Sequence, residues 1–366
     1  MNFILWTAEA DIFTIPGLDR EVRWYGLLFA ASFYLGSLLI GKIFKKEGLK
    51  PTVADDLLMY IIVGTVAGAR LGHVLFYGPY FGQEGYFSHP LSILKVWEGG
   101  LASHGAGFGL LLACFLFSRK HKVNFKWLID RIVIVVALAG CFIRFGNLMN
   151  SEIIGKPVEN GSAFVFIKNT ERTIINDGSL VSSVDYTELN EDTIIEGITY
   201  PKLRFTIIGH STTTQLLLEE QYMHVAGRYL FNENYNKGHR DIKVIDKNTP
   251  HLHFLNNEDP VAYFDAYIIT RHPSQLYESI TTGFLFIILM LLYKKFGKNT
   301  PHGLLAGVFF IYIFLLRFVY EFLKENQVDM ENDMTFNMGQ KLSAPMVIFG
   351  IYLVYNALKK KVKKLY

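Results

Sequence analysis

Seven long apolar stretches constrain this chain more than any other feature of its sequence. They run roughly over residues 22–43, 54–77, 100–118, 128–149, 275–296, 302–323 and 341–358. Each is long enough to cross about 30 Å of hydrocarbon, because an α-helix rises about 1.5 Å per residue. The chain is 51% hydrophobic and only 19% charged, too apolar for an ordinary soluble domain. The sequence therefore predicts a polytopic all-α membrane protein with seven transmembrane helices.

A polar segment separates the fourth apolar stretch from the fifth. It covers residues 156–270 and contains alternating runs such as 163–167 and 203–208, with breakers such as Asn176-Asp177-Gly178 between them. Alternation of this kind is typical of half-buried strands. We expect a β-rich head at 156–270, inserted between membrane parts at 1–155 and 271–366. The pair His251 and His253 could share a strand face, but the histidines of the head have no convincing metal-ligand spacing.

Basic residues are concentrated in alternate loops. They follow the first, third, fifth and seventh stretches: Lys42, Lys45, Lys46, Lys50, Arg119, Lys120, Lys122, Lys126, Lys294, Lys295, Lys298, Lys359, Lys360, Lys361, Lys363 and Lys364. The short loops on the other side, 78–99 and 324–340, hold only Lys95 and Lys324. The positive-inside rule then predicts a cytoplasmic C-terminus, with the N-terminus and the head outside. Cys114 and Cys141 lie within apolar stretches, so we expect buried thiols and no disulfide.

Polar residues within the apolar stretches, or directly next to them, gather at the end predicted to face outside. They are Arg23, Tyr25, Arg70, His104, Arg144, Asn147, Asn150, Glu152, Arg271, His272, Glu278, Arg317 and Glu321. Ionisable groups are costly at this depth and usually mark a site. The alternative is that they cap helices or pair with one another, as Arg317 and Glu321 could do at a spacing of four. Their gathering in six stretches favours one polar cavity open to the outer leaflet.

Three arginines in this group (Arg70, Arg144 and Arg317) accompany the carboxylates. A guanidinium binds phosphate through two parallel hydrogen bonds, so the set predicts a phospholipid headgroup as ligand. Glycines around His104 would let a ligand approach closely. The chain has no phosphate-binding P-loop, His-Glu-x-x-His or cysteine-rich motif, so we expect no metal, cofactor or nucleic-acid partner. A lipid or polar-solute transporter with an outer-leaflet anionic headgroup site is one alternative, although such sites usually lie near the midplane between repeated halves. A membrane scaffold whose head binds a partner is another.

Six motifs, in chain order, resemble those of the prolipoprotein diacylglyceryl transferase family. They are Val22-Arg23-Trp24-Tyr25-Gly26, Gly68-x-Arg70-Leu71-Gly72, Val96-Trp97-x-Gly99-Gly100 with His104-Gly105, Arg-x-Gly-Asn-x-x-Asn-x-Glu-x-x-Gly at 144–155, Arg271-His272-Pro273-Ser274-Gln275-Leu276-Tyr277-Glu278, and Arg317-x-x-x-Glu321-Phe322. The chain departs from the family pattern at Ile143 and Ala106, where glycine is usual, and at Leu148, where phenylalanine is usual. The head is longer than is usual in the family.

The resemblance implies an enzyme of the bacterial cytoplasmic (inner) membrane. Such an enzyme transfers the diacylglyceryl group of phosphatidylglycerol to the lipobox cysteine of a prolipoprotein signal peptide, forms a thioether and releases glycerol phosphate. By motif, Arg144 and Arg317 would hold the lipid phosphate and Tyr25 and His104 would act at the reacting carbon and thiol. The other substrate-binding residues would be Arg70, Asn147, Asn150, Glu152, His272 and Glu321.

The thiol of the substrate needs activation, because its ordinary pKa of about 8.5 keeps it mostly protonated at neutral pH. His104 is the candidate base, since an imidazole with an ordinary pKa of about 6.5 suits proton transfer near neutrality. The positive field of the arginines could favour the thiolate instead. These two explanations stay open at the level of the sequence.

Overall fold

The computed structural model describes most of the chain and divides it into two compact units. The described residues are 3–17, 20–76, 86, 89–96, 99–158, 163–176, 180–230, 242–243, 252–255, 260–324 and 335–363. The first unit is Met1–Leu27, Arg144–Ser279 and Arg317–Lys341; the second is Leu28–Ile143, Ile280–Leu316 and Leu342–Tyr366. These units do not follow chain order, so the division at 155 and 270 stays a prediction.

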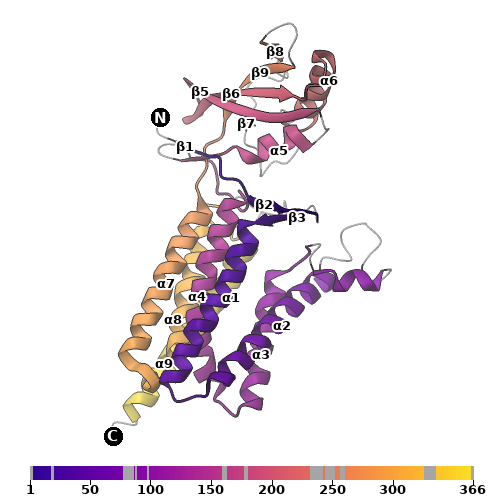
Figure 1. The fold of residues 1–366 in the computed structure, drawn as a ribbon. Coiled ribbons are helices and arrows are strands. Elements are labelled where there is room, and N and C mark those ends of the chain that lie inside the picture. The colour runs from indigo at the N-terminus through magenta and orange to yellow at the C-terminus, as the bar shows by residue number, and fades with distance from the viewer. Residues whose placement is uncertain are drawn as a thin grey trace. The chain divides into compact units, whose positions relative to one another are not determined.

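Every predicted apolar stretch is largely helical (Figure 1). The helices are α1 (Trp24–Lys46), α2 (Pro51–Phe76), α3 (Ser103–Lys120), α4 (Phe125–Met149), α7 (Ser274–Phe296), α8 (Leu304–Tyr320) and α9 (Met338–Lys363). Within the described residues, five helices are long and apolar enough to cross a membrane: α1, α2, α4, α7 together with the short 3₁₀ turn that follows it (Ser274–Asn299), and Met338–Lys359 of α9. The chain is thus a multi-pass membrane protein. The count of seven spans stays a prediction, because α3 and the shorter α8 fall outside this set.

In the second unit, α2 and α3 approach each other through glycine. A Cβ added to Gly72 would lie 2.8 Å from the Cα of Gly105, and one added to Gly68 would lie 2.8 Å from the Cα of Gly109. Small residues at a spacing of four let helix backbones pack closely in lipid. Of the glycines around His104 that were expected from the sequence to make room for a ligand, Gly105 makes room for a neighbouring helix.

The second unit also contains a largely buried charged cluster, here called the buried cluster and made of Glu47, Trp127, Arg131 and Tyr293. The Nη2 of Arg131 lies 2.9 Å from Oε1 of Glu47, and their side chains are 0% and 4% exposed. Trp127 Nε1 and the Tyr293 hydroxyl donate to the same carboxylate at 2.8 and 2.9 Å. The guanidinium carbon also lies 4.9 Å from the Trp127 ring centroid, a cation–π contact. These contacts compensate the desolvation of both charges.

Next to this cluster, Asp130 caps the start of α8. Its carboxylate accepts hydrogen bonds from the backbone N–H groups of Gly303 at 2.6 Å and Ala306 at 2.9 Å. Those N–H groups have no partner within the helix, so the carboxylate satisfies them. Asp130 and Arg131 correct one prediction. Polar groups of the apolar stretches do not gather at one end only, because these two charges lie near the opposite end of α4 from Arg144.

The first unit contains the β-rich head, as the alternating runs predict. Its antiparallel sheet has the order β5-β6-β9-β7, and β8 also pairs with β9; the strands are β5 (Val181–Ile195), β6 (Ile198–Gly209), β7 (Ile242–Lys243), β8 (His253–Phe254) and β9 (Val261–Ile268). Glu196 and Gly197, with φ of 52° and 81°, form the two-residue turn between β5 and β6. Positive φ at both positions matches the twist of such hairpins. Trp97, Gly178 and His251, all used in the sequence argument, lie outside the described residues.

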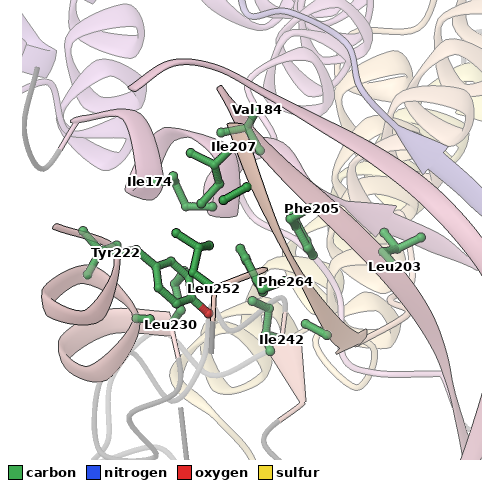
Figure 2. Close-up of a cluster of buried hydrophobic side chains, with 14 of the residues drawn as sticks. Ile174, Val184, Leu203, Phe205, Ile207, Tyr222, Leu230, Ile242, Leu252 and Phe264 are labelled. Carbon is green, nitrogen blue, oxygen red and sulfur yellow. The ribbon is translucent and has the colours of Figure 1, made fainter. Parts of the chain in front are cut away.

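Helices α5 (Lys168–Asn176) and α6 (Gln215–Val225) complete the head. Figure 2 shows apolar side chains of the sheet meeting Ile174 of α5 and Tyr222 of α6. The rings of Phe205 and Phe264, on neighbouring strands, stack with centroids 4.9 Å apart. The remaining strands of the first unit are two short pairs: β1 (Ile4–Trp6) with β4 (Phe164–Phe166), and β2 (Asp11–Ile15) with β3 (Arg20–Arg23).

Candidate functional site

Backbone hydrogen bonds tie together three segments that adjoin α4, α7 and α8. The N–H of Gly155 donates to the carbonyl of His272 at 3.0 Å, and the N–H of His272 donates to the carbonyl of Lys156 at 3.1 Å. Lys156 donates in turn to the carbonyl of Leu323 at 2.7 Å. A Cβ on Gly155 would lie 2.7 Å from Cβ of His272 and 3.0 Å from the Leu323 oxygen. Only glycine fits there, so this position fixes how closely the three segments approach.

The end of α4 folds Glu152 back over the helix. The N–H of Glu152 donates to the carbonyl of Asn147 and that of Ser151 to Leu148, both at 3.0 Å. This is the Schellman arrangement that satisfies the last carbonyls of a helix. The reversal lets the side-chain amides of Asn147 and Asn150 donate to the two carboxylate oxygens of Glu152, each at 3.3 Å. Glu152 as a residue stays exposed.

The backbone just after α4 is strained. Ser151 and Ile153 have φ of 54° and 55°, in a region that favours glycine and that a β-branched residue rarely enters. Two side chains of α7 hold the conformation: the Ser274 hydroxyl donates to the Ile153 carbonyl at 2.8 Å, and the Gln275 amide donates to the Glu152 carbonyl. Three buried oxygens here have no hydrogen-bond partner within the described structure: Asn150 Oδ1, Ser151 Oγ and Gln275 Oε1. Strain and unmatched polar atoms at one place are characteristic of functional sites.

Charged side chains from α4, α7, the end of α8 and the segment after it lie beside this loop; we call Arg144, Glu278, Arg317, Glu321 and Lys324 the charged site. Glu278 lies between two cations, with Oε2 2.6 Å from Nε of Arg144 and Oε1 in contact with Nζ of Lys324. The Glu278 and Lys324 side chains are each 10% exposed, whereas that of Arg144 is 33% exposed. Burial lowers the pKa of Lys324, and the Glu278 carboxylate opposes this shift.

Arg317 and Glu321 form the looser half of the charged site. Nε of Arg317 lies 3.7 Å from Oε1 of Glu321, and 52% of the arginine side chain is exposed. The other carboxylate oxygen of Glu321 accepts a hydrogen bond from the Asn337 amide at 2.9 Å. At 3.7 Å with half its surface exposed, Arg317 is held weakly by its partner. Its guanidinium is therefore accessible to an anion.

Two further predicted residues belong to the same unit. Tyr25 packs against the end of α4, because a Cβ on Gly146 would lie 3.0 Å from Cδ2 of its ring. His272 Nδ1 lies 3.4 Å from the Tyr277 hydroxyl, and burial lowers the pKa of His272 below its usual value. The imidazole is therefore biased toward its neutral form. Eight predicted site residues thus share the first unit: Tyr25, Arg144, Asn147, Asn150, Glu152, His272, Arg317 and Glu321.

Arg70 and His104 belong to the second unit. The guanidinium of Arg70 donates to four carbonyl oxygens at 2.5 to 3.2 Å, those of Ser92, Ile93, Gly99 and Gly100. These bonds order the chain between α2 and α3, so a phosphate would compete with carbonyls for Arg70. The His104 ring is exposed and packs edge-on against Phe76, with centroids 5.2 Å apart. The roles given to both residues stay predictions.

Sequence reasoning missed two members of the charged site. Glu278 ends a motif that carried the family resemblance but had no role assigned to it. Lys324 was counted only as a loop charge. A signal for Lys324 was present, because Arg317, Glu321 and Lys324 follow the spacing i, i+4, i+7 that places residues on one helix face. The partner of Lys324 gave no such signal, because Glu278 is distant in the sequence.

These features define a multi-pass membrane protein with a partly exposed charged site on strained backbone. A family model described as "Prolipoprotein diacylglyceryl transferase" matches residues 11–356, and the chain belongs to that family. It is therefore a transferase of lipoprotein biosynthesis, and the resemblance carried by the six motifs is confirmed.

Relatives from several bacteria support the assignment. Each of the following is named phosphatidylglycerol–prolipoprotein diacylglyceryl transferase. The protein of Tolumonas auensis is 33% identical over 98% of this chain and 100% of its own length. Those of Chloroherpeton thalassium and Bacteroides fragilis are 31% and 30% identical, each over 98% of this chain and 96% of the relative. With the apolar helices, this bacterial family places the chain in the inner membrane as a multi-pass protein.

Proposed function

We propose that this chain transfers the diacylglyceryl group of phosphatidylglycerol to the lipobox cysteine of prolipoproteins. The Arg144–Glu278 pair is the observation that carries the proposal: a guanidinium oriented through Nε while a third of its side chain stays exposed. An arginine held in this way keeps its Nη1–Nη2 edge for a planar, doubly hydrogen-bonded contact with a phosphate. The family membership and the named relatives support phosphatidylglycerol and a prolipoprotein as the two substrates.

The phosphate is the leaving group, so the arginines act where charge develops. The cysteine sulfur attacks the glycerol carbon that bears the phosphate ester. A C–S bond forms and the C–O bond breaks, with its electron pair leaving on the phosphate oxygen as glycerol phosphate. Arg144 and Arg317 stabilise the departing oxygens, an effect that is large when the donors are already oriented. Glu152, with the amides of Asn147 and Asn150, and Glu321, with Asn337, keep the surrounding polar groups in place.

The thiol proton must leave before or during the attack. His104 is the proposed base and Tyr25 the proposed neighbour of the reacting groups, both by family motif. The alternative is activation by the positive field of the arginines, which lowers the free energy of a thiolate relative to the thiol. Arg70 and His272 are proposed as further members of the lipid site.

The proposal extends to topology. We infer seven spans, with the N-terminus and the β-rich head outside and the C-terminus in the cytoplasm, from the basic residues in alternate loops. Cysteine in place of Glu188 in the head should react with a membrane-impermeant thiol reagent in intact spheroplasts. Cysteine in place of Lys50, between α1 and α2, should react only after the membrane is opened. The reverse pattern would overturn the orientation and move the site to the cytoplasmic leaflet.

Transfer itself is tested with the purified protein, phosphatidylglycerol vesicles and a lipobox peptide. The expected product is a peptide whose mass increases by one diacylglyceryl group, on its single cysteine. The matched control is the same peptide with serine at that position, which should stay unmodified. Absence of product with phosphatidylglycerol, from protein that is folded by its melting curve, would contradict the proposed function.

A further inference from the structure

Glu278 and Lys324 form an arrangement with Arg144 that differs from an ordinary ion pair. One carboxylate contacts two cations through different oxygens, Oε2 toward Arg144 and Oε1 toward Lys324. The two partners differ in exposure. The Lys324 and Glu278 side chains are 10% exposed, so this half of the arrangement is shielded from solvent, while the Arg144 side chain is 33% exposed. A ligand arriving from outside therefore meets Arg144.

The charges explain why two cations are needed. Arg144 and Glu278 alone would form a neutral pair with little attraction for an anion. A buried carboxylate without Lys324 would also draw the whole guanidinium toward itself, because an unpaired buried charge is costly. With Lys324 satisfying the second oxygen, the three groups carry one positive charge in excess. The excess positive charge lies on Arg144, the exposed group of the three, where it can attract an anionic phosphate.

The backbone fixes Lys324 in this position. Gly155 and Lys324 form an antiparallel bridge, and Lys156 donates to the carbonyl of Leu323 at 2.7 Å. Lys324 is thus attached to the segment that follows the strained loop at 151–153. Lys324 interacts electrostatically with Glu278, Arg144 and Glu321. A long, flexible side chain held at 8% residue exposure in such a frame is not a solvated loop charge.

We propose that Glu278 and Lys324 are positioning residues for phosphatidylglycerol: Glu278 orients Arg144, and Lys324 neutralises Glu278 so that Arg144 keeps its charge for the lipid phosphate. The inference rests on the proposed function. It predicts that the charge balance of the pair matters more than the identity of either side chain. Removing Lys324 alone should be harmful, and removing both charges together should be less harmful.

The test compares Lys324→Met, Glu278→Gln, the double variant and Lys324→Arg in phosphatidylglycerol-dependent transfer. Lys324→Met should raise the KM for phosphatidylglycerol by about tenfold or more, as expected when one partner of a buried charge pair is lost. Its kcat should fall less than that. The double variant should recover most of the loss, since the amide oxygen introduced by Glu278→Gln can still accept from Nε of Arg144. Lys324→Arg should stay near the parent.

The head provides a matched control pair of the same chemistry. Lys202 Nζ lies 2.6 Å from Glu191 Oε2, with the glutamate side chain 63% exposed. Lys202→Met and Glu191→Gln should leave the KM for phosphatidylglycerol unchanged. A parent-like KM in Lys324→Met, or a double variant no better than Lys324→Met when both fold, would overturn the proposal. If Lys324→Met does not fold, the test uses the KM for phosphatidylglycerol of the other three variants, namely the double variant, Glu278→Gln and Lys324→Arg.

A second readout separates this inference from the proposed function. Phosphatidylglycerol added to the protein in detergent should raise its melting temperature, because a ligand that binds the folded state stabilises it. The rise should shrink in Lys324→Met and return in the double variant. If the parent binds phosphatidylglycerol with this pattern but transfers nothing, the proposed function fails and the positioning role stands. If the parent transfers the diacylglyceryl group but phosphatidylglycerol raises the melting temperature of Lys324→Met as much as that of the parent, the proposed function stands and the positioning role fails.

Discussion

Two charged clusters of this protein each include an arginine of α4, Arg131 in one and Arg144 in the other, and they are built differently. In the buried cluster, Arg131 and Glu47 are almost fully buried, and Trp127 and Tyr293 add hydrogen bonds to the same carboxylate. In the charged site, Arg144 keeps a third of its side chain exposed and Arg317 half. Unpartnered buried oxygens adjoin only the second of these clusters within the described residues.

The difference shows how a membrane charge can be assigned. An ionisable group at membrane depth is by itself compatible with a structural or a functional role. A charge whose donors and acceptors are all matched inside the protein holds helices together. An ionised side chain that stays partly exposed beside strained backbone can still form hydrogen bonds and ion pairs with a ligand. Substitution of Arg144 should therefore lower activity more than stability, and substitution of Arg131 should lower stability more than activity.

Arg144→Lys should have the largest effect on activity. Lysine keeps the charge but loses the planar fork, so transfer from phosphatidylglycerol should fall by about 10²-fold or more. The melting temperature should change little, since the position is partly exposed. Initial rates and melting curves of the same preparation check both halves. Near-normal turnover would show that a point charge is sufficient and that the fork is not used.

Arg131→Met should have the largest effect on stability. It leaves Glu47 buried without its cation, a loss of about 3–5 kcal/mol. The yield of folded protein and the melting temperature should both drop, while the rate per folded molecule stays near the parent value. Combining Arg131→Met with Glu47→Gln should restore part of the stability, because no unpaired charge is then buried. An unchanged melting curve of Arg131→Met would show that the buried cluster is not the structural counterpart of the charged site.

His104→Gln separates activation of the thiol from binding of the phosphate. If His104 is the base, the rate at neutral pH should fall by about 10²-fold, within the usual range for general base catalysis. The rate should recover toward alkaline pH, because a thiol with a pKa of about 8.5 then ionises without help. Single-turnover transfer between about pH 6.5 and 9.5, a window that brackets the pKa of the free thiol, measures this. A variant with the parent rate at neutral pH would leave activation to the arginines alone.

The smallest expected effect concerns strain beside the charged site. Ser151→Gly places the residue best suited to φ of 54° at the helix end and should stabilise the protein by up to about 1 kcal/mol. Ser151→Ala is the matched control, since it also removes the hydroxyl but keeps the strained backbone. Melting curves compare the two. If both variants lose stability equally, the hydroxyl of Ser151 matters more than its backbone conformation.

The sequence alone determined the helices, the β-rich head and the family. Apolar runs of about 20 residues and strict alternation are local patterns, so each can be read without knowing what packs against it. The same holds for Arg144, Asn147 and Glu152, because their spacing at the end of one helix already predicts that they lie close together. The Schellman turn that joins Asn147 to Glu152 needs only neighbouring residues.

The tertiary structure alone decided the charge pairs between segments that are distant in the sequence. Glu47 is 84 residues from Arg131, and Lys324, in the segment after α8, meets Glu278 of α7. Arg70 carries the same signal as Arg144 in the sequence, yet its guanidinium donates to loop carbonyls. A pattern reveals that a charge sits in an apolar stretch, but the partner is chosen by the packing of distant segments. That packing separates a structural arginine from one that can bind a ligand, because it sets how much of each side chain stays exposed.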